Sequence, residues 1–179
     1  SPNQIISWLY VHDVQNNPES RQYGIVDFNN GTSRSDAFTG SNCLDYKNHI
    51  LGPNYAIQGN ILLGQQILDS MEYYFLNTSG CLPEKLMAAM NGAKVVGADT
   101  RCMVEGTSSL SAFLRMALPT DSYNNLFLDI NVAGTAPNEE PIDVLETKYN
   151  IWKNSHISYC DSVSSSEISQ KKDVEIHPN

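Results

Sequence analysis

The sequence predicts an α+β domain in which short antiparallel strands pack against helices. Three observations lead to this prediction: an Asn-Gly turn between two strand-like segments, two consecutive helical segments, and a later pair of strands. The predicted order is one helix, three strands, two helices, two strands and a final helix. Because helices and strands do not alternate along the chain, a doubly wound parallel sheet is disfavoured.

The first elements are indicated by capping and turn residues. Ser1 can serve as the N-cap and Pro2 as the first residue of a helix. Segment 23–28 is apolar on both faces, which is typical of a strand that is covered on two sides. The turn residues Asn30 and Gly31 then supply the positive φ angles for a hairpin to a second strand near 35–39.

A third strand is predicted at 55–59, directly before two helices. The first of these helices has an apolar stripe from Ile67 to Phe75, and the second begins at Pro83. Because only a short loop separates them, we expect an antiparallel helix pair lying on a sheet.

The last elements are a hairpin and a helix. Segments 110–118 and 126–132 are predicted to pair, since apolar and polar residues alternate along the second segment. Pro141 then begins a helix whose apolar stripe ends at Trp152.

Length and charge exclude several classes of protein. The 179 residues suit one domain plus a tail, and 41% hydrophobic residues suffice for a buried core. A net charge of −9 disfavours nucleic acid as a partner. No apolar run approaches the roughly 20 residues of a membrane span, so none is expected.

Several strings occur in one order along the chain: SPNQIISWL, RQYGIVD, AFTG, YAIQGNILLG and GADTR. With them, residues 1 to about 152 resemble the bacterial domain-of-unknown-function family number 1028, placed in the N-terminal-nucleophile (Ntn) hydrolase superfamily. The resemblance implies a four-layer αββα sandwich and amide-bond hydrolysis without a cofactor. It also implies more chain before Ser1, including strands of the sandwich and the nucleophile.

We therefore expect residues 1–157 to be the C-terminal portion of an Ntn-hydrolase-like domain that lacks its N-terminal strands. An N-terminal fragment of the same precursor, or a neighbouring subunit, should complete the sheet and make the protein an oligomer, because an open sheet exposes apolar surface. The alternative is a non-catalytic extracellular structural or assembly subunit with the same fold.

The residues that could line a catalytic pocket lie in three places. Gln58 and Asn60 could stabilise an oxyanion or instead satisfy nearby backbone groups. Asp99 and Arg101 could form a charged pair in the pocket or fasten a loop. His49 follows Cys43 at a spacing that is no recognised zinc pattern, so a structural histidine is favoured and no metal is expected.

An Ntn hydrolase uses the hydroxyl or thiol of its first residue as nucleophile and the free amine of that residue as base. Ser1 fits this residue type. However, Pro2 and the helical pattern that follows favour the role of a helix cap.

Four cysteines allow three pairings. Cys81 and Cys102 bracket a predicted helix and its following loop, so a bridge between them would leave Cys43 with Cys160. Four buried free thiols are the other interpretation.

The end of the chain indicates export. Residues 158–179 read as a Ser-rich linker, and the closing VEIHPN resembles the start of the sorting domain that Bacteroidota use for type IX secretion. We therefore expect a secreted or cell-surface protein whose tail contacts the secretion machinery.

Overall fold

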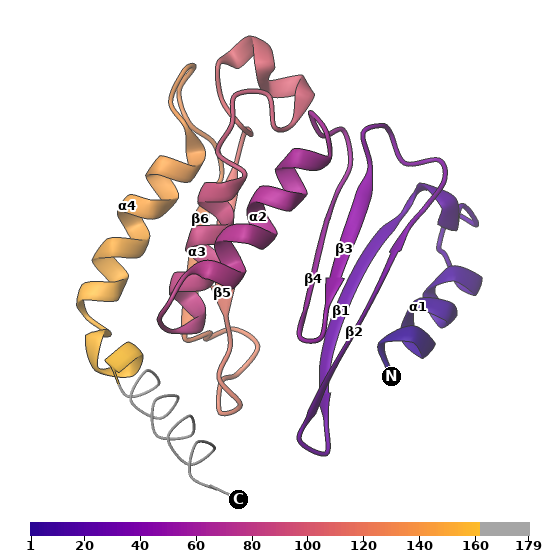
Figure 1. Cartoon of the computed structure of the whole chain (residues 1–179), viewed down its shortest axis with the longest axis horizontal. Coiled ribbons are helices and arrows are strands. Elements are labelled where there is room, and N and C mark those ends of the chain that lie inside the picture. The colour runs from indigo at the N-terminus through magenta and orange to yellow at the C-terminus, as the bar shows by residue number, and fades with distance from the viewer. Residues whose placement is uncertain (162–179) are drawn as a thin grey trace, which may run out of the picture.

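The computed structural model describes residues 1–161 and shows a mixed α+β fold, as predicted (Figure 1). The described part contains, in order, α1 (Pro2–Val11), β1 (Gln22–Asn29), β2 (Thr32–Thr39), β3 (Asn48–Gly52), β4 (Tyr55–Gly59), α2 (Gln65–Asn77), α3 (Leu82–Gly92), β5 (Ala112–Met116), β6 (Leu128–Val132) and α4 (Pro141–Asn154). Short 3-10 helices span Pro18–Ser20 and Thr100–Glu105. The predicted sorting motif and most of the predicted linker, residues 162–179, lie outside the described residues.

The strands form three antiparallel hairpins, β1–β2, β3–β4 and β5–β6. Asn30 and Gly31 both have positive φ angles, of 50° and 80°, which confirms the predicted Asn-Gly turn between β1 and β2. Strand β3 was not predicted. It pairs with β4 around a turn at Pro53 and Asn54, so His49 lies directly opposite Gln58.

Helix α1 covers one face of the β1–β2 hairpin (Figure 1). The ring of Tyr10 on α1 packs edge-on against Phe38 of β2, with centroids 5.5 Å apart. Near the start of α1, the Asn3 amide donates to the Asp36 carboxylate at 2.9 Å. Apolar and polar contacts from the helix therefore both reach β2.

The opposite face of β1 packs against the β3–β4 hairpin. A Cβ atom on Gly24 would lie 2.2 Å from Oε1 of Gln58, so a larger residue here would displace this side chain. Helix α2 lies on the far side of the β3–β4 hairpin, where Tyr55 contacts Phe75. The elements α1, β1–β2, β3–β4 and α2 thus contact one another in that sequence (Figure 1).

The main hydrophobic core lies elsewhere, between the β5–β6 hairpin and helices α3 and α4. Alternate residues of β5 and of β6 point into it, which confirms the alternation predicted for the second of these strands. Leu128 of β6 and Leu145 of α4 are fully buried there, and Met87 of α3 is 3% exposed.

The disulfide differs from the expected pairs. Cys81 is bonded to Cys160, whereas Cys43 and Cys102 are free and buried, so the expected Cys81–Cys102 and Cys43–Cys160 bridges are wrong. Cys81 precedes α3, whereas Cys102 lies in the 3-10 helix after it. Thr100, at the start of that 3-10 helix, donates its N–H to Ile61 and so holds Cys102 near the segment after β4.

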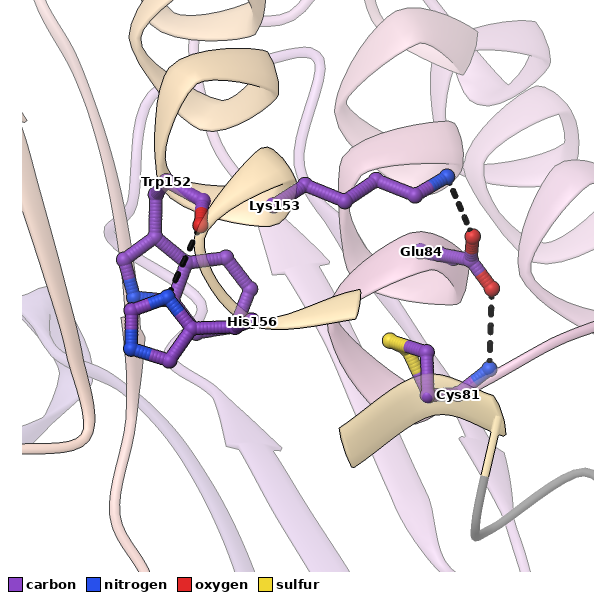
Figure 2. The surroundings of a disulfide bond; sticks show 6 residues. Cys81, Glu84, Trp152, Lys153 and His156 are labelled. Carbon is purple, nitrogen blue, oxygen red and sulfur yellow. Dashed lines mark hydrogen bonds and ion pairs between the residues drawn. A yellow bond between two sulfur atoms is a disulfide. The ribbon is translucent and has the colours of Figure 1, made fainter. Parts of the chain in front are cut away.

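The end of α4 explains the bond that does form. Lys153 on its last turn binds Glu84 of α3 at 2.5 Å, and Glu84 also accepts the N–H of Cys81 (Figure 2). The chain therefore returns to the start of α3, where Cys160 meets Cys81 with Cα atoms 5.0 Å apart. Residues 158–161, the first part of the predicted linker, are helical and belong to the folded region.

Among residues 1–161, none of the helices combines the length and apolar character that crossing a membrane requires.

Candidate functional site

A polar network connects the β1–β2 and β3–β4 hairpins, with Gln22 at its centre. The Gln22 amide nitrogen donates to Thr39 Oγ1 at 3.0 Å and to the Gly59 carbonyl at 2.9 Å. Its oxygen accepts from the amide of Asn60 at 2.9 Å. Asn60, a predicted pocket residue, is therefore engaged in joining the two hairpins.

His49 belongs to the same network. Its Nδ1 atom lies 2.9 Å from Thr39 Oγ1, and the ring is half-buried between β2 and β3. A hydroxyl beside an imidazole can be a nucleophile and its base. Here the Thr39 hydroxyl also accepts from Gln22, and neither Thr39 nor His49 lines the groove described next, so the pair acts as a cross-hairpin contact.

Gln58 differs from its predicted companions because its amide has no hydrogen-bond partner among the described residues. Its side chain is exposed. The side chain lies over Gly24 of β1. An amide that has no protein partner can donate to, or accept from, a ligand.

Gln58 lines a groove of about 460 Å³ between β4 and β5. Residues of helices α2 and α3 line it as well. The lining residues are Tyr55, Ala56, Ile57, Gln58, Met71, Phe75, Leu86, Ala89, Met90, Ser111, Ala112, Phe113, Leu114 and Arg115. Most of these side chains are apolar, which suits a chain segment or an apolar group of a ligand.

Two polar side chains of the groove are already paired. The Tyr55 hydroxyl donates to the Glu72 carboxylate at 2.6 Å, and this hydrogen bond, with burial and the Glu72 charge, raises the pKa of Tyr55 to about 12. Arg115 binds Asp129 across the β5–β6 hairpin at 2.7 Å. Gln58 is therefore the polar side chain of the β4 wall that can meet a ligand.

Asp99 and Arg101 form the expected charged pair, at 2.6 Å, away from the groove. Asp99 also caps the 3-10 helix by accepting the N–H of Arg101. The hydrogen-bonded guanidinium lowers the pKa of Asp99. The backbone N–H of Asp99 donates to Ser108, and that of Thr100 donates to Ile61, so the loop that carries the pair is fastened to the segment after β4.

Ser1 precedes α1, and its hydroxyl donates to Oε1 of Gln4 at 3.0 Å. This contact is that of a helix start. His12 and His156 lie at helix ends, where each ring stacks on the tryptophan one turn earlier, as Figure 2 shows for His156.

One trio of potential metal ligands occurs within residues 1–161, namely Cys81, Glu84 and Cys160. The two sulfur atoms are bonded to each other, so neither is a thiolate. Glu84 is paired with Lys153 (Figure 2). The trio therefore stabilises the junction of α3 and α4.

The structure thus brings His49, Gln58 and Asn60 to the β3–β4 hairpin and leaves Asp99 and Arg101 in a separate loop. Gln22 and Thr39 were missed by the sequence analysis. Their only signal was a glutamine and a threonine at the open ends of a predicted hairpin, where polar residues are ordinary.

The solved structure of protein SPO2555 from Silicibacter pomeroyi, a DUF1028 protein, is similar to this chain, with a TM-score of 0.64 at 21% sequence identity. The similarity covers 85% of this chain and 60% of SPO2555, so the chain spans less than two thirds of that relative's length. Among curated proteins, none matches the chain. The model of the family of unknown function DUF1028 matches residues 1–143, and the chain therefore belongs to this family.

Proposed function

We propose that this chain forms the larger part of an Ntn-hydrolase-like sandwich and that the complete protein hydrolyses amide bonds. The nucleophile belongs to an N-terminal segment outside residues 1–179. The observation that carries the proposal is the contact order α1, β1–β2, β3–β4, α2, because it has the layer sequence of an αββα sandwich. The N-terminal amine of such a nucleophile titrates at about 7.7 to 8.0, which suits a base near neutral pH.

Gln58 is the residue of this chain that we assign to the reaction. Its amide is exposed at the wall of the groove and has no partner among the described residues. An amide N–H aimed at the carbonyl oxygen of the substrate stabilises the negative charge that develops there. Asn60 and Asp99 keep structural roles, because the Asn60 side chain is bonded to Gln22 and the Asp99 side chain to Arg101.

The test uses protein expressed from the complete gene and a β-lactone probe that acylates nucleophiles. We expect the intact mass to rise by one probe and peptide mapping to place it on an N-terminal Thr, Ser or Cys. Gln58→Ala should slow labelling by about 10²-fold to 10³-fold, the usual effect of removing one oxyanion donor.

The matched control is Gln66→Ala, which removes an exposed glutamine of α2 without touching the groove. It should label at the rate of the unaltered protein. A blocked N-terminus, or a protein that takes up no probe, would contradict the hydrolase proposal.

Export is part of the same proposal. The Cys81–Cys160 disulfide supports an oxidising compartment, because such bonds persist mainly in exported proteins. The VEIHPN tail supports delivery by type IX secretion. Fractionation of the native organism measures whether the protein is exported. Repeating it with a gene that lacks the codons for the tail measures whether export depends on the tail.

A non-catalytic assembly subunit is the second candidate, and exposed apolar side chains favour it. Trp8 and Val11 on α1 are 59% and 75% exposed, and Phe28 on β1 is 74% exposed. Such surface suits a subunit interface. Light scattering that finds a defined oligomer, together with no probe uptake, would support this candidate over the hydrolase.

A further inference from the structure

Helices α3 and α4 border a cavity of about 240 Å³. On one side of it Asn91 of α3 donates to Glu146 of α4 at 2.8 Å, and on the other Lys153 of α4 binds Glu84 of α3 at 2.5 Å (Figure 2). The two helices therefore run antiparallel here. Most residues that line the cavity have polar side chains, and it shares no lining residue with the apolar groove between β4 and β5.

Tyr149 of α4 lines this cavity with a hydroxyl that has no partner. The residue is only 4% exposed, and its hydroxyl forms no hydrogen bond within residues 1–161. Burial, together with the charge of Glu84 on the same wall, raises the pKa of Tyr149 to about 12. The hydroxyl therefore keeps its proton near neutral pH and can either donate or accept. Buried hydroxyls normally have a partner, so this one requires an explanation.

Asn91 carries a second buried atom of this kind. A carboxylate can only accept a hydrogen bond, so the amide nitrogen of Asn91 faces Glu146 and its oxygen, Oδ1, faces elsewhere. That oxygen is buried and has no partner in the described chain. Within residues 1–161, Asn91 Oδ1 and the Tyr149 hydroxyl are the only two buried side-chain atoms in this condition, and both belong to residues that line one cavity.

The charges around the cavity indicate the sign of a ligand. Glu84 is neutralised by Lys153, as Figure 2 shows. Glu146 receives a hydrogen bond from the neutral Asn91 amide and forms no ion pair among the described residues. Lys94 interacts with Glu146 only at longer range, because its ammonium is bound to Asp143 at 2.7 Å. The side of the cavity at Glu146 is therefore negative and favours a cation.

The available atoms favour an ammonium group over a metal ion. Glu146, Asn91 Oδ1 and the Tyr149 hydroxyl can all accept hydrogen bonds, and a primary ammonium group has three N–H groups to donate. A calcium ion takes six to eight oxygen ligands, which is more than these three side chains supply.

We propose that this cavity binds a small molecule that carries a primary ammonium group. The ammonium group lies between Glu146 and Asn91 Oδ1, and an oxygen of the same molecule accepts from the Tyr149 hydroxyl. A water molecule takes up about 30 Å³ in the liquid, so 240 Å³ holds a molecule of several heavy atoms. The site depends neither on the proposed amide hydrolysis nor on the groove that contains Gln58.

Calorimetric titration of the protein expressed from the complete gene tests the proposal, with ethanolamine as the probe. Ethanolamine has a primary ammonium group and a hydroxyl, and we expect saturable binding at one site. Choline keeps the charge and the hydroxyl but has no N–H, so it should bind at least about tenfold more weakly. Ethylene glycol, which has no charge, should not bind.

Two variants assign the binding to this cavity. Glu146→Gln removes the charge but retains an oxygen for the Asn91 amide, and it should weaken ethanolamine binding at least about tenfold. Tyr149→Phe should weaken binding about fivefold. Without ethanolamine it should not lower the melting temperature, because the hydroxyl has no protein partner to lose. The control Glu105→Gln makes the same charge change at an exposed residue outside the cavity and should bind as the unaltered protein does.

Three results would overturn the proposal: no saturable binding of ethanolamine, equal binding of choline, or equal weakening by Glu105→Gln and Glu146→Gln. A melting temperature that falls in Tyr149→Phe would also count against it, because the hydroxyl would then have a structural partner. The comparison of ethanolamine with choline uses the unaltered protein, so it decides the matter even if a variant fails to fold.

Discussion

The two halves of the molecule cover their strands to different extents. One half, called the sealed half below, consists of β5, β6, α3 and α4. Its helices cover one face of the β5–β6 hairpin, and Leu128 and Leu145 are fully buried there. The other half, called the open half, contains β1 to β4, and in it Val26 and Phe28 are 45% and 74% exposed on the face that meets the β3–β4 hairpin. The comparison shows that one half completes its own core, whereas the other leaves part of its contact face uncovered.

The strongest test of this contrast is a pair of truncations. Leu145→Ala should lower the free energy of unfolding by about 2–5 kcal/mol, because it opens a cavity in the sealed half. Phe28→Ala should change it by no more than about 0.5 kcal/mol in residues 1–179, since the ring is largely exposed. Urea denaturation measures both. Equal losses would show that the two halves are equally complete.

A somewhat smaller effect is expected at the disulfide, which belongs to the sealed half. Cys160→Ser should lower the free energy of unfolding by about 2–4 kcal/mol, because the bond closes a long loop between residues 79 positions apart. Reductant should cause the same loss in the unaltered protein and no further loss in the variant. A variant that still responds to reductant would indicate a different pairing.

The smallest effect concerns acid stability of the open half. The Asp13 carboxylate accepts from Arg21 at 2.7 Å and from the backbone N–H groups of Gln15 and Asn17. The hydrogen bond from Arg21 is the main reason that the pKa of Asp13 is lowered to about 2. Because this lies below the unfolded value of about 3.9, the stabilisation is present above pH 4 and is lost as the pH falls towards 2.

Asp13→Asn should therefore flatten the fall in melting temperature between pH 4 and pH 2. The control is Asp45→Asn, whose carboxylate is 82% exposed. It should leave the shape of that acid limb unchanged. Identical acid limbs for Asp13→Asn and the unaltered protein would contradict the assignment.

Much of the fold could be predicted because its signals are local. The Ser1-Pro2 helix start, the Asn-Gly turn and the alternation in β6 each depend on neighbouring residues, and each prediction is confirmed. Strand β3 was missed because its five residues run directly into Pro53 and contain no alternating pattern. The disulfide depends on where the chain returns after α4, which no local signal specifies.

The candidate site was predicted only in part for the same reason. His49 and Gln58 were both chosen, but their cross-strand pairing requires β3. Gln22 enters the network only because β1 crosses the β3–β4 hairpin. The groove joins β4 to β5, which are far apart in sequence, so neither strand alone indicates it.

The bond between Cys81 and Cys160 turns the sealed half into a covalent ring that contains α3, β5, β6 and α4. Between β5 and β6 this ring includes Tyr123, whose side chain is 94% exposed and accessible to a protease. A cut there would open the ring without releasing a fragment. The molecule can thus be nicked at this position and still remain in one piece.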